Sequence, residues 1–188
     1  KHSTPCGVAV GSSALETYKK TFECDPVSIF GGIIGMNFKV DAATAEELNK
    51  TFLEIVMAPD FDAVALEILR KKKNLRIIKI KNAVSDKQTW VKIDGGILVQ
   101  DNDNQFSEDI QTVTVFKPSA QQEKALLFAQ RVVKYVKSNA IVVSNGFQAL
   151  GIGGGQVNRI WATQHAVERA KEKFSGDLVL ASDAFFPF

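Results

Sequence analysis

The sequence has few cysteines, and the two that are present form no recognisable pattern. Cys6 and Cys24 are the only cysteines among 188 residues, and neither belongs to a CxxC motif. A chain without a disulfide framework is typical of a reducing compartment rather than of a secreted protein. We therefore expect a cytoplasmic protein.

Long apolar runs and a strong charge of one sign are also lacking. The most apolar stretch, residues 27–36, is interrupted by Ser28 and by paired glycines, so it falls short of the ~20 apolar residues that span a membrane. Lysine and arginine total 23 against 21 aspartates and glutamates, which gives a formal charge of +2. So small an excess does not favour a polyphosphate partner. We expect neither a membrane nor a nucleic acid as partner.

The two ends of the sequence are unusual for a complete protein. The first residue is lysine rather than methionine, and the last residues read SDAFFPF, an apolar finish that would be awkward as an exposed terminus. We expect the chain to be part of a longer protein.

Strand and helix signals alternate along the chain, which predicts a layered α/β fold with αβα layers. Ser or Thr followed three residues later by Glu or Gln marks three helix starts, and a fourth helix ends in a basic run that complements its negative pole. The predicted helices cover residues 13–22, 44–54, 62–71, 119–136 and 156–174. The predicted strands are Val8–Val10, Ile33–Met36, Ile55–Ala58, Leu75–Ile80, Ile97–Gln100, Val113–Phe116, Ala140–Val143, Phe147–Gly151 and Leu178–Ala181.

An Asn145-Gly146 turn joins two of these strands as a hairpin, so a mixed sheet is favoured over a purely parallel one. A boundary before Lys117-Pro118 is the one plausible division of the chain into two lobes.

The glycine stretch at residues 151–155 leads into a helix, as phosphate loops do. It lacks the lysine and hydroxyl of the Walker pattern, and Gln156 stands where the dinucleotide fingerprint needs its last glycine. Arg159 follows in the first helical turn, beside the positive helix pole, where a cation is locally unfavourable. Either an anionic ligand or a nearby carboxylate would offset that cost, and the residues alone leave both open.

Lys1 and His2 suggest chemistry, because a histidine accepts a proton near neutral pH and an ammonium stabilises a developing oxyanion. Adjacent side chains on a strand point to opposite faces, so a joint role requires a bend. Asn139 at a helix-to-strand junction is either a turn former or a binding residue, and Phe30-Gly31 either a bulge or a point of close approach to a ligand.

Seven blocks, in this order, give the sequence a family resemblance: KHSTPCGVAVG, ECDPVSIFGG, EIVMAPDFD, GGILVQD, VKSNAIV, GIGGGQVNRI and LASDAFFPF. Together they resemble the AICAR transformylase domain of the bifunctional purine biosynthesis enzymes, over essentially the whole chain. The resemblance implies formyl transfer from 10-formyltetrahydrofolate to 5-aminoimidazole-4-carboxamide ribonucleotide (AICAR). It further implies two cytidine-deaminase-like lobes, at 1–115 and 116–188, and a homodimer with its active sites at the interface.

The resemblance also assigns roles to residues. It implies His2 as proton acceptor, Lys1 as stabiliser of the transition state and Asn139 as the residue that orients them. The implied AICAR-binding residues are Phe30, Gly31, Glu54, Arg159 and Phe185, the implied folate-binding residues are Ile160 and Pro187, and a potassium ion is implied near Ser138 and Asp183. Glu54 is placed by counting through an ungapped helix.

Two rival hypotheses belong to other classes. A zinc-dependent deaminase needs H-x-E and P-C-x-x-C ligands, whereas His2 is followed by Ser3-Thr4 and Pro5-Cys6 by no second cysteine, so we expect no zinc. A catalytically inactive nucleotide-binding or dimerisation fragment is the other rival. We expect impaired or no turnover from the chain alone, since further site segments of the family lie outside it.

Overall fold

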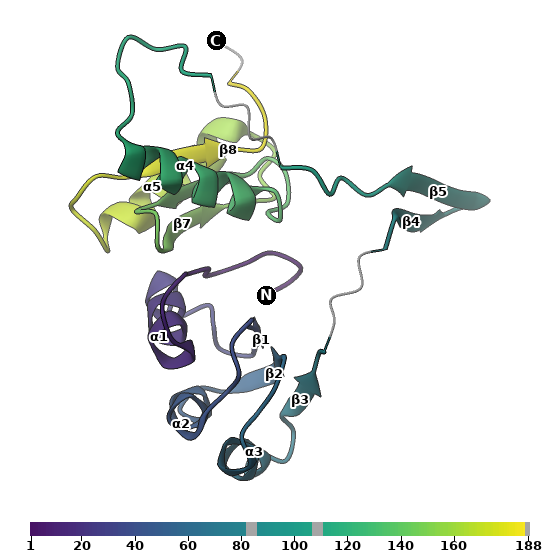
Figure 1. The fold of residues 1–188 in the computed structure, drawn as a ribbon. Coiled ribbons are helices and arrows are strands. Elements are labelled where there is room, and N and C mark those ends of the chain that lie inside the picture. Colours follow the sequence, from purple (N-terminus) through teal and green to yellow (C-terminus); the bar gives the residue numbers. More distant parts are fainter. Residues whose placement is uncertain (82–85, 107–110, 187–188) are drawn as a thin grey trace.

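The computed structural model describes residues 1–81, 86–106 and 111–186. The five described helices pack on two three-stranded sheets, and a two-stranded hairpin lies between these sheets in the sequence (Figure 1). One three-stranded sheet is parallel and the other antiparallel, so the predicted mixed α/β class is confirmed.

The parallel sheet has the order β1-β2-β3, formed by Gly32–Gly35, Leu53–Ala58 and Arg76–Lys79. Helices α1 (Ala14–Cys24), α2 (Ala42–Asn49) and α3 (Ala63–Arg70) share an apolar core with it. The core lies on one face: Val56 and Ala58 of β2 are buried, whereas Ile33 of β1 is 51% exposed. This sheet therefore packs as two layers within the described residues.

The antiparallel sheet has the order β7-β6-β8, formed by Ala149–Gly153, Ile141–Ser144 and Val179–Ser182. Its central strand β6 is buried on both faces: Val142 packs in the core under α4 (Ala120–Val133), and Ile141 and Val143 pack in the core under α5 (Arg159–Lys171). Side chains alternate along a strand, so one strand serves both cores. This half has the predicted αβα layers.

The glycines of the 151–155 stretch let α5 approach β7 closely. A side chain at Gly151 would collide with the backbone of Ala166, and one at Gly153 with the backbone of Ala162. Ala162, Ala166 and Ala170 are fully buried along the facing stripe of the helix. The glycine cluster is thus mainly a helix-packing surface.

The N-terminal segment joins the two parts of the chain. Ala9 forms an antiparallel bridge with Gln148, and the Gln148 side chain donates to the carbonyl of Lys20 in α1 at 3.0 Å. The predicted strand at 8–10 is thus reduced to a single bridge at the edge next to β7.

Other predictions need correction. Asp41, not Thr44, caps α2, and it accepts a hydrogen bond from the Thr44 amide at 2.8 Å. The helix ends at Asn49, so Glu54 lies on strand β2 and not in a helix. The predicted strand Val113–Phe116, inside the described range 111–186, is irregular backbone, because its side chains are strongly exposed and find no sheet to cover.

The hairpin of β4 (Gln88–Ile93) and β5 (Gly96–Asp101) projects away from both sheets (Figure 1). Only β5 was predicted. Apolar side chains occupy both faces of the hairpin. Trp90 pairs with Val99 on one face and Val91 with Leu98 on the other, and each of these residues is about half exposed or more.

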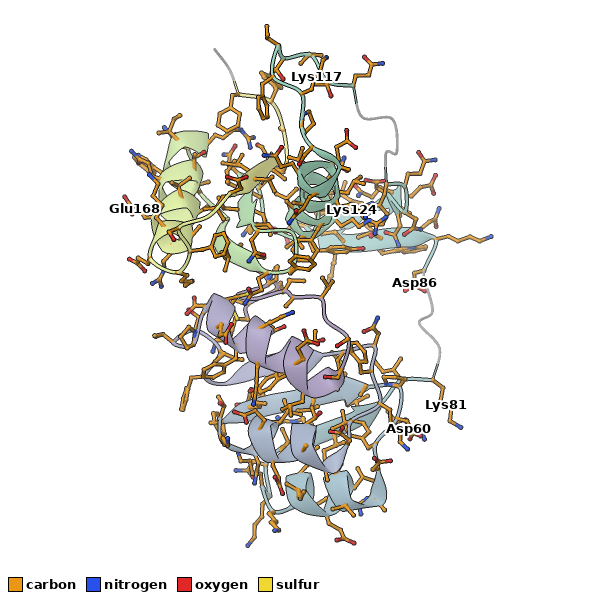
Figure 2. All side chains as sticks on the ribbon, turned by 60° about the vertical axis from the view of Figure 1, so that its left-hand side comes forward. Asp60, Lys81, Asp86, Lys117, Lys124 and Glu168 are labelled. Carbon is orange, nitrogen blue, oxygen red and sulfur yellow. The ribbon has the colours of Figure 1, made fainter. Side chains whose placement is uncertain are left out.

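Charged side chains are spread over both parts of the molecule. Figure 2 shows Glu168 and Lys124 on the helices of the antiparallel sheet and Asp60 beside the parallel one. Such an even distribution agrees with the small net charge.

Candidate functional site: two neighbouring clefts

A tight bend at the start of the chain brings Lys1 to the Phe30–Gly31 turn. The Thr4 amide donates to the Lys1 carbonyl at 2.8 Å, and His2 and Ser3 both adopt left-handed backbone, with φ of 49° and 61°. Such angles are unfavourable for residues with a side chain and mark a constrained turn. The bend that a joint role of Lys1 and His2 requires is therefore made by His2 and Ser3 themselves.

Lys1 and the Phe30–Gly31 turn are in direct contact. The Lys1 ammonium donates to the Phe30 carbonyl at 2.8 Å, and a Cβ on Gly31 would lie 3.4 Å from the same nitrogen. Gly31 has φ of 65°, which favours glycine, and its amide donates to Phe52 at 2.8 Å. Phe30 is 65% exposed, and the centroid of its ring lies 5.2 Å from that of the Phe52 ring. The structure thus brings together three of the predicted site residues.

Lys1, His2 and Phe30 line a cleft of about 520 Å³ that also contains side chains from α5 and the segment after it. We call it the Lys-His cleft. Its cationic side chains are Lys1, Arg169 and Lys173, and two imidazoles, of His2 and His165, lie among them. Asp25 is the only carboxylate among its described lining residues. The cleft therefore has a positive electrostatic balance, suited to an anionic small molecule.

Asp25 orders the loop that carries Phe30. Its carboxylate accepts hydrogen bonds from the amides of Val27 and Ser28, at 3.2 and 2.9 Å. Burial alone would raise the pKa of Asp25, but the hydrogen bonds from Ser28 and the nearby Arg169 and Lys173 lower it overall. Asp25 is thus a carboxylate at neutral pH.

A second cleft, of about 400 Å³, contains most of the other predicted site residues. Asn139, Arg159, Ile160 and Phe185 line it, and we call it the Asn-Arg cleft. Phe185 is 81% exposed and Ile160 44%, so both present apolar surface to the cleft. Predicted nucleotide-binding and folate-binding residues therefore lie side by side here.

Arg159 lies next to a carboxylate of the protein, Asp183, which is one of the two alternatives that the sequence left undecided. Asn158 caps α5, Arg159 begins it, and the Arg159 guanidinium forms an ion pair with Asp183 and donates to the Ser182 hydroxyl at 2.8 Å. Only 11% of the Arg159 side chain is exposed. The cost of a cation at the helix N-terminus is thus offset within the protein itself.

Asp183 accepts hydrogen bonds from three directions. Ser138 donates its hydroxyl, Ala140 donates its amide at 2.9 Å, and Arg159 supplies its guanidinium. Burial alone would raise the pKa of Asp183, but these donors lower it overall. These three donors fix the orientation of the Asp183 carboxylate. The potassium ion near Ser138 and Asp183 stays a prediction.

The two clefts are linked through Gln156. Gln156 lines the Lys-His cleft, and its carbonyl accepts the side-chain N–H of Asn139 at 2.8 Å. Among the described lining residues the clefts share no member, so Asn139 stands one hydrogen bond away from the cleft that holds His2.

Two predicted site residues stand apart. Glu54 forms an ion pair with Arg76 on the neighbouring strand at 2.9 Å and is absent from the described lining of both clefts. Pro187 lies outside the described residues.

Sequence reasoning did not select the basic side chains His165 and Arg169 of α5 and Lys173 just after it. They are spaced by four residues, which places side chains along one side of a helix. That spacing was the available signal.

No cluster of three His, Cys, Asp or Glu side chains able to hold a metal ion occurs in the described ranges. Over those same residues, no helix has the length and apolar character needed to cross a membrane.

The described residues thus form an α/β fold with a cationic cleft and a second cleft lined by both polar and apolar side chains, the kind of concave surface on which small molecules bind. The chain itself belongs to the AICARFT/IMPCHase bienzyme family, whose family model matches residues 1–169.

Its relatives agree with this membership. The chain is 61% identical to the "Bifunctional purine biosynthesis protein PurH" of Fusobacterium nucleatum, and 60% and 59% identical to the proteins of that name from Brachyspira hyodysenteriae and Clostridium botulinum (strain Okra). Each alignment covers the whole chain but only 38%, 36% and 37% of the respective relative. The chain thus spans little more than a third of the length of these relatives.

Proposed function

We propose that the chain carries the catalytic pair of a formyltransferase that moves a formyl group from 10-formyltetrahydrofolate to AICAR. The observation that carries the proposal is the constrained Lys1-His2 bend, which holds both residues on a cationic cleft in a chain of this family.

The chemistry follows from the two side chains. The aromatic amine of AICAR attacks the formyl carbon and loses a proton to the His2 imidazole. The tetrahedral species carries negative charge on its oxygen, which the Lys1 ammonium stabilises. The bond from that carbon to folate N10 then breaks, and the proton held by His2 passes to N10.

The residues of the Asn-Arg cleft supply binding and orientation in this proposal. Asn139 orients the reacting groups, Arg159 and Phe185 contact AICAR together with Phe30, Gly31 and Glu54, and Ile160 and Pro187 contact the folate. Ile160 supplies exposed apolar surface suited to a pterin ring, and Phe185 supplies exposed apolar surface suited to the imidazole of AICAR. A joint site requires the Asn139–Gln156 connection to place both clefts around one pair of substrates.

We also propose two cytidine-deaminase-like lobes, 1–115 and 116–188, and a cytoplasmic homodimer. The β4–β5 hairpin supports the dimer, because a two-stranded hairpin with apolar side chains on both faces needs a partner to cover them.

The test measures binding and turnover on the same chain. AICAR should raise the melting temperature of the wild-type chain in a saturable way. His2→Gln should keep that shift and abolish any formation of tetrahydrofolate from 10-formyltetrahydrofolate. An unchanged melting temperature at millimolar AICAR would overturn the proposal.

The second candidate is a catalytically inactive nucleotide-binding and dimerisation fragment. It is favoured by the separation of His2 and Asn139 into different clefts. It predicts the AICAR shift without turnover in the wild-type chain, whereas measurable turnover, lost in His2→Gln, excludes it.

A further inference from the structure

Arg159 and Arg169 lie on the same helix but differ in how their charge is satisfied. Arg159 is 11% exposed and is held by Asp183 and Ser182 at hydrogen-bonding distance. Arg169 is 40% exposed, and its nearest carboxylates in the described chain, Glu172 and Asp25, lie at 3.7 and 4.0 Å. Neither separation allows a strong N–H···O hydrogen bond.

Asp25 is a poor partner for Arg169, because its carboxylate is already engaged. One of its oxygens accepts the amides of Val27 and Ser28, and only the other faces the guanidinium. Glu172 is 64% exposed, so water competes for its charge. The fork of N–H donors on Arg169 therefore remains largely available in the Lys-His cleft.

Other basic side chains line the same cleft as this guanidinium. His165 precedes Arg169 by four residues on the same side of α5, and both line the cleft. Lys173 is fixed at the cleft by the carbonyls of Cys24 and Leu150. Two of its three N–H donors are used in this way, but its charge remains, and Lys1 adds another. The permanent charges of the cleft sum to three positive and one negative among the described lining residues.

We infer that Arg169 and His165 form a binding site for a phosphate dianion in the Lys-His cleft. A phosphomonoester carries nearly two negative charges at neutral pH, and an arginine fork binds two of its oxygens at once. Lys173 and Lys1 contribute long-range attraction. That the phosphate belongs to AICAR rests on the proposed function, but the anion site itself does not.

This site would orient the nucleotide. With its phosphate against α5, the ribose and imidazole extend across a cleft of about 520 Å³ towards Lys1, His2 and Phe30. Arg169 is then a positioning residue, since the reaction takes place at the other end of the substrate.

The experiment measures dissociation constants of the chain for ribose 5-phosphate, AICAR and the ribonucleoside that lacks the phosphate. Wild type should bind both phosphate esters and bind the ribonucleoside at least tenfold more weakly than AICAR. Arg169→Ala should weaken the binding of both esters at least tenfold and leave the ribonucleoside unchanged, and Arg169→Lys should give an intermediate result. Lys171→Ala is the matched control, because it removes the same charge from the same helix without touching the described cleft lining.

A second variant separates binding from folding. Asp25→Asn keeps the oxygen that accepts the loop amides but removes the competing charge, so it should tighten the binding of ribose 5-phosphate. A purely structural Arg169–Asp25 contact predicts no such gain.

The possible outcomes distinguish the two proposals. Failure of ribose 5-phosphate to bind, or wild-type affinity in both Arg169→Ala and Asp25→Asn, overturns the anion site. Binding of ribose 5-phosphate that depends on Arg169, in a chain that does not bind AICAR, supports the anion site and overturns the formyltransferase proposal.

Discussion

The carbonyl of Gln156 accepts two hydrogen bonds from Asn139, one from its side chain at 2.8 Å and one from its backbone at 3.2 Å. The neighbouring Gly155 amide donates to Lys137 at 2.6 Å. The loop after β7 is thereby fixed to the segment before β6. These hydrogen bonds also hold Asn139, which lines one cleft, against Gln156, which lines the other.

Asn139→Asp should weaken the connection between Asn139 and Gln156 and lower the stability of the chain. A carboxylate cannot donate to the Gln156 carbonyl and repels it, so we expect a loss of about 1–2 kcal/mol in the free energy of unfolding. Hydrogen exchange of the Gly155 amide should become faster. Asn145→Asp is the control, because aspartate keeps the oxygen that accepts the amides of Phe147 and Gln148 and loses only a long contact to the Gln148 side chain, at 3.3 Å. Equal losses in the two variants would contradict the prediction.

Asp183→Asn should destabilise the chain in a pH-dependent way. The pKa of Asp183 is lowered in the folded state, so its contribution is present above the unfolded pKa, near 4, and is lost as the pH falls through the lower folded value. At pH 7 we expect a loss of about 2 kcal/mol, and urea unfolding should show the difference from wild type shrinking below pH 4.

Asp60→Asn is the matched control for that experiment, because Asp60 forms an exposed ion pair with Lys79. Asp60→Asn should lower the free energy of unfolding by less than Asp183→Asn does. A difference between wild type and Asp183→Asn that grows as the pH falls would contradict the assigned sign.

Charge on the hairpin should alter assembly rather than folding. Under the proposed dimer, replacing Trp90 and Leu98 by lysine places cations on both faces of the ribbon. Light scattering after gel filtration should then give the monomer mass, with unchanged circular dichroism. Val64→Lys, at a similarly exposed site on α3, should leave the mass unchanged. A double variant that remains dimeric would exclude the hairpin as the contact.

The two thiols should resist alkylation. Burial raises the pKa of Cys24 to about 11 and also raises that of Cys6. At pH 8, Cys24 then has roughly a hundredfold less thiolate than at its ordinary pKa of 9.0, and its side chain is inaccessible. Mass spectrometry should show iodoacetamide on Cys24 only after unfolding. Rapid labelling of Cys24 in the folded chain would contradict this assignment.

Local chemistry made some elements predictable. Ser119 and Gln122 form the reciprocal capping box that their spacing indicates, and Asn145-Gly146 makes the expected hairpin between β6 and β7. Residue type alone could not separate Asp41 from Thr44 as the cap of α2, since both are good cap residues. The chain enters the helix at Asp41, and this leaves Thr44 buried.

Predicting the site needed long-range information. The resemblance selected Lys1, His2, Asn139 and Arg159, but nothing in the local sequence pairs Arg159 with Asp183, which follows 24 residues later. The contribution of α5 to the Lys-His cleft depends equally on how the two parts of the chain pack, which periodicity along one helix does not reveal.

The contact between the glycines of β7 and the alanines of α5 fixes the position of this helix on the sheet. Arg159 and Arg169 are ten residues apart, which corresponds to about 15 Å along the axis and about 80° around it. With Gly151 and Gly153 pressed against the backbone of Ala166 and Ala162, sliding or rotating the helix would force backbone atoms into one another. The backbones of both arginines therefore have fixed positions relative to β7, and a molecule that reaches across both clefts has to span the distance between them.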